Sequence, residues 1–84
     1  MTYDSREHTM EVFPRITVDA DKCGGKPCLR GFRITVEHVL ARLAEGATVQ
    51  ELLREWDFLE PDDIAAALRY ASTLAGERLL PLAS

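Results

Sequence analysis

The chain has 84 residues, 46% of them hydrophobic and 29% charged, with a formal net charge of −4 at pH 7. This length allows one domain, and the composition is that of a folded globular protein rather than of a disordered tail. Because no apolar run reaches the roughly 18 residues of a membrane span and the polar beginning is unlike a signal or transit peptide, we expect a cytoplasmic protein that does not contact membranes.

The charges are unevenly distributed along the chain. Residues 15–33 carry five cationic side chains against two acidic ones, whereas residues 34–84 carry four arginines against nine acidic residues. Cations on loops and hairpins can reach phosphates, so these are candidate DNA contacts, and an ordinary solvated surface is the alternative. The four candidates in this segment are Lys22, Lys26, Arg30 and Arg33.

The first third of the chain is predicted to contain short strands. Residues 1–11 show no periodicity and are expected to form a flexible leader. Residues 12–18 are rich in β-forming side chains, and Pro14 marks this strand as an edge strand or an irregular one. A loop with two consecutive glycines follows. Residues 27–29 and 32–34 are short apolar runs around Arg30-Gly31, a spacing that predicts a β-hairpin.

From Thr35 onward the apolar spacing predicts helices. The first helix begins at the N-cap Thr35 and ends at Gly46, and the second begins at a capping box made by Thr48 and Glu51. The third begins at Pro61, with acidic residues in its first turn, and ends at Gly76. The residues expected on the buried face of this third helix are Ile64, Leu68, Ala71 and Ala75. Trp56 is interpreted as a core residue.

These elements predict a mainly α fold. A short N-terminal strand or hairpin would precede a three-helix bundle, and the last two helices would form a helix-turn-helix of the homeodomain-like kind. Residues 12–76 would form this domain, and residues 77–84 a C-terminal tail. Arg69 on the third helix is the fifth candidate DNA contact. This helix is expected to read DNA bases only weakly, because its first turn is acidic and Arg69 is its only cation.

Catalytic and metal sites are not expected. Cys23 and Cys28 form one pair with four residues between them, whereas structural zinc needs four ligands, and His8 and His38 do not lie at ligand spacing. We interpret the cysteines as one buried apolar side chain and one loop thiol. No residue is arranged with His38 for nucleophilic catalysis. We therefore expect no metal, no cofactor and no enzymatic activity.

Several stretches of the sequence resemble one known family. They are the run from Arg15 to Asp19, the run from Cys23 to Val36 with its Gly-Gly-Lys-Pro and Arg-Ile-Thr-Val blocks, the helix end from Leu43 to Gly46, the run from Glu51 to Leu53, and the third helix from Asp63 to Ala71. Together, over about residues 13–72, they resemble the bacterial and archaeal family called domain of unknown function 433. Phe32 and the connector beginning at Trp56 depart from the family pattern without disturbing the fold.

The resemblance implies a function. Members of this family are commonly interpreted as antitoxins of type II toxin–antitoxin pairs, whose partner is a small nuclease-like toxin related to the PIN domain. We therefore expect an antitoxin that binds a PIN-like toxin and its own operator DNA. A protein-interaction adaptor that does not bind DNA is the alternative.

The C-terminal tail is the predicted toxin contact, because Leu79, Leu80 and Leu82 stand close together beyond the last helix. Packing of these leucines on the chain's own core or on a second copy is the alternative. A homodimer or higher homo-oligomer is also expected. Phe58, Tyr70 and the tail leucines lie outside the apolar faces assigned to the helices, and contact between subunits would bury them.

Overall fold

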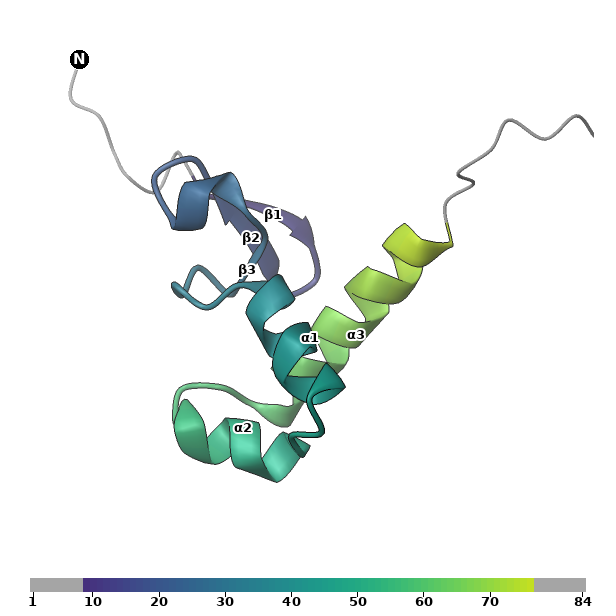
Figure 1. The fold of residues 1–84 in the computed structure, drawn as a ribbon. Coiled ribbons are helices and arrows are strands. Elements are labelled where there is room, and N and C mark those ends of the chain that lie inside the picture. The colour runs from purple at the N-terminus through teal and green to yellow at the C-terminus, as the bar shows by residue number, and fades with distance from the viewer. Residues whose placement is uncertain (1–8, 77–84) are drawn as a thin grey trace, which may run out of the picture.

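The computed structural model describes residues 9–76 (Figure 1). Three short strands come first, namely β1 (Thr9–Phe13), β2 (Ile16–Asp19) and β3 (Cys28–Leu29), with a 3₁₀ turn (Cys23–Gly25) before β3. The helices α1 (Val36–Ala44), α2 (Val49–Glu55) and α3 (Pro61–Ala75) follow. The sheet lies at one end of α1 and α2 at the other, while α3 crosses α1 and projects beyond it (Figure 1). Within residues 9–76, no helix has the length and apolar character needed to cross a membrane.

The strands form an antiparallel sheet in the order β1-β2-β3. β1 and β2 form a hairpin in which Phe13 pairs with Ile16, and β2 continues the sheet by pairing Ile16 with Leu29. The predicted hairpin turn after Leu29 is present, because Phe32 N–H donates to the Leu29 carbonyl at 2.8 Å.

The predicted mainly α class is wrong, because the fold is mixed α/β with a small three-stranded sheet. The cause is a reversal at Pro14-Arg15, where Arg15 adopts a left-handed φ of 68°. The chain therefore folds back inside residues 12–18, which were expected to form a single strand. β1 moreover begins at Thr9, within the stretch assigned to the leader.

The homeodomain-like three-helix bundle is wrong for the same reason. The sheet and the helices share one core, so the helices do not pack only on one another. The core residues come from β2, β3, the segment before α1, all three helices and the connector between α2 and α3: Ile16, Leu29, Ile34, Val36, Val39, Leu52, Leu59, Ile64, Ala66 and Ala67.

The three predicted helices are present, and local capping explains their starts. The Thr35 hydroxyl accepts a hydrogen bond from the His38 N–H at 3.0 Å, and Thr48 and Glu51 form the predicted capping box. Such caps satisfy backbone N–H groups that have no partner within the helix. Pro61 occupies the first turn of α3.

The predicted buried face of α3 is rotated from the observed one. Leu68 is 50% exposed, whereas Asp63 is fully buried together with Ile64, Ala66 and Ala67. The buried face therefore includes a carboxylate of the first turn that the apolar pattern left out, and the contacts of that carboxylate explain the rotation.

Candidate functional site

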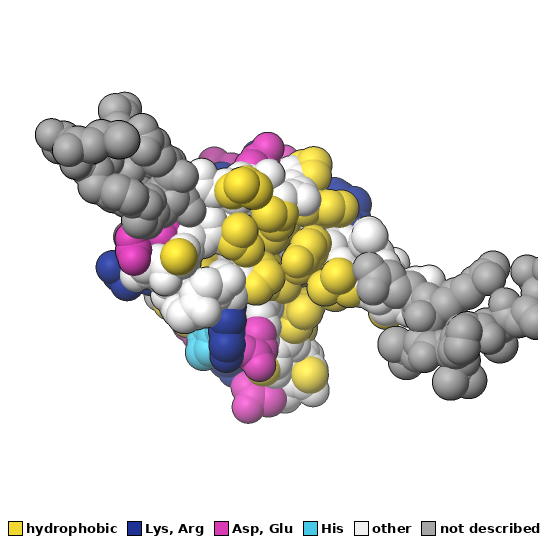
Figure 2. Space-filling model, turned by 90° about the horizontal axis from the view of Figure 1, so that it is seen from above, with side chains coloured by type: hydrophobic (Ala, Val, Ile, Leu, Met, Phe, Trp, Pro, Cys, Tyr) yellow, Lys and Arg dark blue, Asp and Glu magenta, His cyan; other side chains and the backbone are white. Residues whose placement is uncertain are grey.

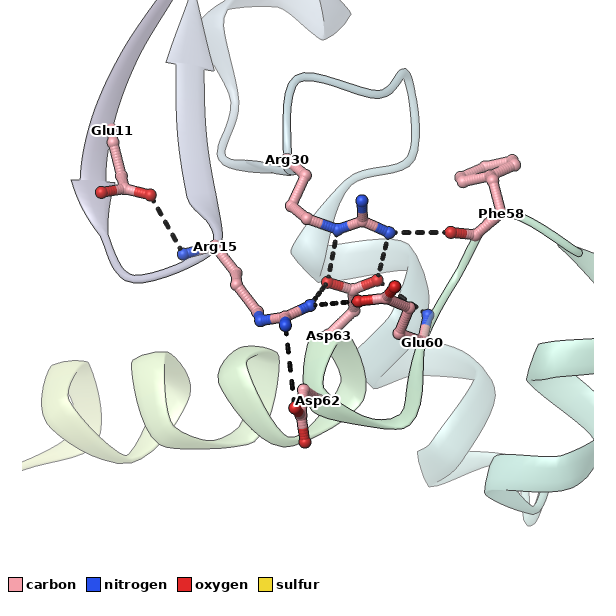
Figure 3. Close-up of polar contacts among 7 residues, drawn as sticks. All are labelled: Glu11, Arg15, Arg30, Phe58, Glu60, Asp62 and Asp63. Carbon is pink, nitrogen blue, oxygen red and sulfur yellow. Dashed lines mark hydrogen bonds and ion pairs between the residues drawn. The ribbon is translucent and has the colours of Figure 1, made fainter.

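The N-terminal end of α3 is held by a cluster of ion pairs, which we call the Asp63 cluster (Arg15, Arg30, Glu60 and Asp63; Figure 3). Arg30 binds the Asp63 carboxylate through two bonds, Nε to Oδ1 and Nη2 to Oδ2, both 2.8 Å long. Arg15 Nη1 donates to Asp63 Oδ1 at 2.9 Å and to Glu60 Oε1 at 2.7 Å. The Glu60 backbone N–H donates to Asp63 Oδ2 at 2.8 Å.

These contacts leave the Asp63 carboxylate no free acceptor site. A carboxylate offers about four lone-pair sites, and the four bonds to Arg15, Arg30 and Glu60 use them. The side chain of Asp63 is 0% exposed, whereas those of Arg15 and Arg30 remain 32% and 30% exposed. The cluster therefore joins the sheet to α3, and its buried carboxylate, Asp63, has no oxygen left for a ligand.

The turns of the sheet place both arginines. Arg15 follows Pro14 in the β1–β2 turn, and Arg30 and Gly31 form the turn after β3 with φ values of 44° and 76°. Two successive left-handed residues are what a type I′ hairpin turn requires. Left-handed backbone is unfavourable for arginine, so the ion pairs to Asp63 offset part of that cost.

Asp63 remains ionised well below neutral pH. Burial alone would raise its pKa, but the hydrogen bonds from Arg30, the Glu60 N–H and Arg15 outweigh that effect. The net result is a pKa below the ordinary value for aspartate.

Most of the predicted DNA-binding cations are engaged within the chain. Lys22 Nζ donates to the Gly31 carbonyl at 2.9 Å, and Lys26 Nζ pairs with Glu37 at 3.0 Å. Arg30 belongs to the Asp63 cluster and also donates to the Phe58 carbonyl.

The two remaining candidates are free of such contacts. Among residues 9–76, the guanidinium groups of Arg33 and Arg69 take part in none of the hydrogen bonds or ion pairs, and both residues are exposed. The structure therefore does not gather the five predicted cations into one free basic surface.

One depression on the surface is a groove between α1 and the C-terminal half of α3, with a volume of about 290 Å³. We call it the apolar groove; its walls are Pro27, Val36, Leu40, Tyr70, Ala71 and Leu74, and Lys26 and Glu37 complete its lining. Figure 2 looks onto the molecule from above Figure 1 and shows apolar side chains gathered on this face, with charged ones at its edge. The packing of Tyr70 against Phe13 at 5.5 Å connects the groove to β1.

A second, smaller depression lies at the N-terminus of α1. It has a volume of about 240 Å³ and is lined by Arg33, Ile34, Thr35, His38 and Trp56. His38 and Trp56 meet edge to face at 5.1 Å. Trp56 is half-buried and packs against the core, as its interpretation as a core residue requires in part.

Cys23 and Cys28 are both free thiols, the first partly exposed and the second buried. Burial, followed by a hydrogen bond with Cys23, raises the pKa of Cys28 to about 11, so this thiol is protonated at neutral pH. No group of three or more metal-ligating side chains occurs in the part of the chain that the structure describes.

The predicted toxin-contact residues Leu79, Leu80 and Leu82 lie outside the described residues. The sequence reasoning missed both the Asp63 cluster and the apolar groove. The acidic first turn of α3 and the two arginines were visible as charges, but nothing local indicated that they meet. The groove combines residues from three separate segments, and among its apolar residues only Tyr70 was proposed as an interface residue.

Comparison with known proteins gives a consistent result. The model of the family described as "Protein of unknown function (DUF433)" matches residues 16–71. The chain is 37% identical over 65 residues to the uncharacterized protein y4eO of Sinorhizobium fredii, a match that covers 75% of this chain and 29% of that protein.

A solved structure is also similar. The crystal structure of a DUF433 member protein from Anabaena variabilis superposes with a TM-score of 0.68 at 32% identity, covering 70% of this chain and 58% of that one. The chain thus spans less than a third of the curated relative and more than half of the solved one.

Proposed function

Because the chain belongs to the DUF433 family, we propose that it is the antitoxin of a type II toxin–antitoxin pair and neutralises a PIN-like ribonuclease by binding it directly. The observation that supports binding to a protein is the apolar groove, which presents Leu40, Tyr70 and Leu74 on one open face. Exposed apolar surface of this kind marks protein interfaces in soluble proteins. The role as an antitoxin comes from the family resemblance.

The charge of the chain suits such a partner. A ribonuclease binds RNA through a basic surface, and residues 34–84 carry nine acidic side chains against four arginines. Complementary charge steers association and sets orientation. The chain itself performs no reaction in this proposal and acts by occupying the toxin, in the cytoplasm where toxin and RNA meet.

The test uses the protein encoded next to this chain, provided that it carries a PIN-like acidic site. We expect the two proteins to copurify, and the ribonuclease activity of the partner on a labelled RNA to fall as this chain is added up to equal amounts. Leu74→Glu should weaken inhibition at least tenfold. Leu68→Glu is the matched control, because Leu68 is equally exposed on the same helix but outside the groove. A partner that stays fully active with excess chain contradicts the proposal.

Operator DNA is a second candidate partner, and the free guanidinium groups of Arg33 and Arg69 favour it. We expect a gel shift with the upstream DNA at low salt. Replacing both arginines by alanine should weaken it and lower the slope of log affinity against log salt by about 2. Retained affinity in this double variant contradicts a role for these two residues. No shift in the unaltered protein favours the adaptor that binds protein alone.

The expected homodimer also stays a prediction. Met10 and Phe58 are 64% and 38% exposed and leave apolar surface for a second copy. Light scattering at roughly tens of micromolar protein should give the mass of a dimer if the interface is worth about 8 kcal/mol. A monomeric mass at that concentration contradicts it.

A further inference from the structure

The apolar groove has no occupant among residues 9–76, although Leu74 in its wall is 48% exposed. We infer that the chain's own residues 77–84 fold back and lie in this groove when no partner is bound. The inference concerns the free chain and does not depend on the existence of a toxin.

The first argument is position. α3 contributes Tyr70, Ala71 and Leu74 to the groove, and Gly76 caps the helix only two residues after Leu74. The described part of the chain therefore ends only two residues beyond the wall of the groove.

The second argument is reach. Tyr70 and Leu74 are four residues apart, which is about 6 Å along a helix. Eight residues of extended chain cover about 26 Å, so residues 79–82 can run back along this wall after a reversal at residues 77–78.

The third argument is chemical complementarity. The segment reads Glu-Arg-Leu-Leu-Pro-Leu-Ala-Ser, with its charges at the start and its leucines at positions 79, 80 and 82. The groove has the same arrangement, apolar walls beside the exposed Lys26–Glu37 ion pair. Removing both apolar surfaces from water is favourable, and the two charged residues can stay at the edge.

The covalent connection to α3 favours this segment over a second copy of the chain as the occupant of the groove. A segment attached to the groove wall by a few residues has an effective concentration of about millimolar. A second copy at micromolar concentration supplies the same leucines at a far lower concentration. A toxin that binds this face has to displace the segment, and this last consequence rests on the proposed function.

The test is NMR spectroscopy of the full chain with labelled leucine and valine methyl groups. We expect nuclear Overhauser contacts between the leucine methyl groups of residues 79–82 and the Tyr70 ring. Replacing Leu79, Leu80 and Leu82 together by serine should abolish them and shift the methyl signals of Val36, Leu40 and Leu74. The signals of Leu52, which is buried outside the groove, should not move.

Two single substitutions provide the matched comparison. Leu74→Glu places a charge in the groove and should abolish the same contacts, whereas Leu68→Glu should retain them. The two leucines lie roughly 120° apart around α3, given 3.6 residues per turn. Because both are about half exposed, neither change should unfold the protein, and the Leu52 signals verify this.

Three results overturn the inference. Absence of the contacts in the unaltered chain excludes docking of the segment. Loss of the contacts in both the Leu74→Glu and the Leu68→Glu variants shows that the groove is not the docking site. Contacts that appear only between differently labelled copies in a mixed sample identify a second copy as the occupant.

Discussion

The two ends of α3 present opposite surfaces. At its N-terminal end, the buried carboxylate of Asp63 is bonded through both oxygens to the guanidinium groups of Arg15 and Arg30, and the exposed Glu60 pairs with Arg15. In its C-terminal half, Tyr70 and Leu74 form one wall of an open apolar groove. The N-terminal end is held by ion pairs within the chain, whereas the C-terminal half leaves apolar surface available for binding.

The difference separates stability from recognition on a single helix. Removing one partner of a buried ion pair is costly, because it leaves the other without its counter-charge. Replacing a half-exposed apolar residue costs little in the isolated protein. Substitutions at the N-terminal end should therefore change folding, and those in the C-terminal half should change binding.

The largest effect is expected for Asp63→Asn. The amide cannot accept the same charge-assisted bonds from Arg15 and Arg30, so we expect a loss of about 3 kcal/mol in the free energy of unfolding. Urea denaturation followed by the fluorescence of Trp56, the only tryptophan, measures this loss. Asp62→Asn is the control, because Asp62 is 77% exposed and lies 3.7 Å from Arg15. Equal losses in both variants would show that the buried Asp63 contributes no more to stability than an exposed carboxylate does.

The pH dependence of the unfolding free energy should report on the ionisation of Asp63. Its folded pKa lies below that of an unfolded aspartate, about 3.9, so its contribution is fully present above that pH and is lost as the pH falls through the folded pKa. The difference in unfolding free energy between the unaltered protein and Asp63→Asn should thus be constant from about pH 7 to pH 5 and shrink below about pH 4. A difference that does not change in acid contradicts this assignment.

A smaller effect is expected in the middle of α3. Tyr70→Leu keeps an apolar side chain in the groove but removes the ring that packs on Phe13. We expect a loss of about 1 kcal/mol, the usual value of an aromatic pair. Tyr70→Phe retains the ring and should be close to neutral, and thermal unfolding of both variants tests the difference.

The smallest effect on stability is expected for Leu74→Glu. Leu74 is 48% exposed, so we expect a change within about 0.5 kcal/mol, although the same substitution should impair partner binding. Chemical denaturation beside the binding assay checks both statements. A loss as large as that of Asp63→Asn would remove the contrast between the two ends of the helix.

Local signals predicted the helices but not the way they pack. Thr35, Thr48 and Pro61 mark helix starts because capping depends on residues within one turn. The Arg30-Gly31 turn was predictable for the same reason, since its spacing and its glycine are local features.

The fold class and the candidate site depended on contacts distant in sequence. No glycine marks the reversal at Pro14-Arg15, so residues 12–18 read as one strand. The face of α3 was assigned by choosing apolar residues, which selected Leu68 and left Asp63 outside. Asp63 lies inside because its partners come from turns 33 and 48 residues away, and no local pattern carries that information.

These same separations bear on the order of events in folding. A bond between Arg15 and Asp63 closes 48 residues of chain and one between Arg30 and Asp63 closes 33, so neither can form before the sheet and α3 have met. Closing such loops costs chain entropy ahead of any gain. The helix caps, in contrast, join residues within one turn and can form before the sheet and α3 meet. We therefore expect the ion pairs to form late in folding. Such interactions lower the unfolding rate more than they raise the folding rate.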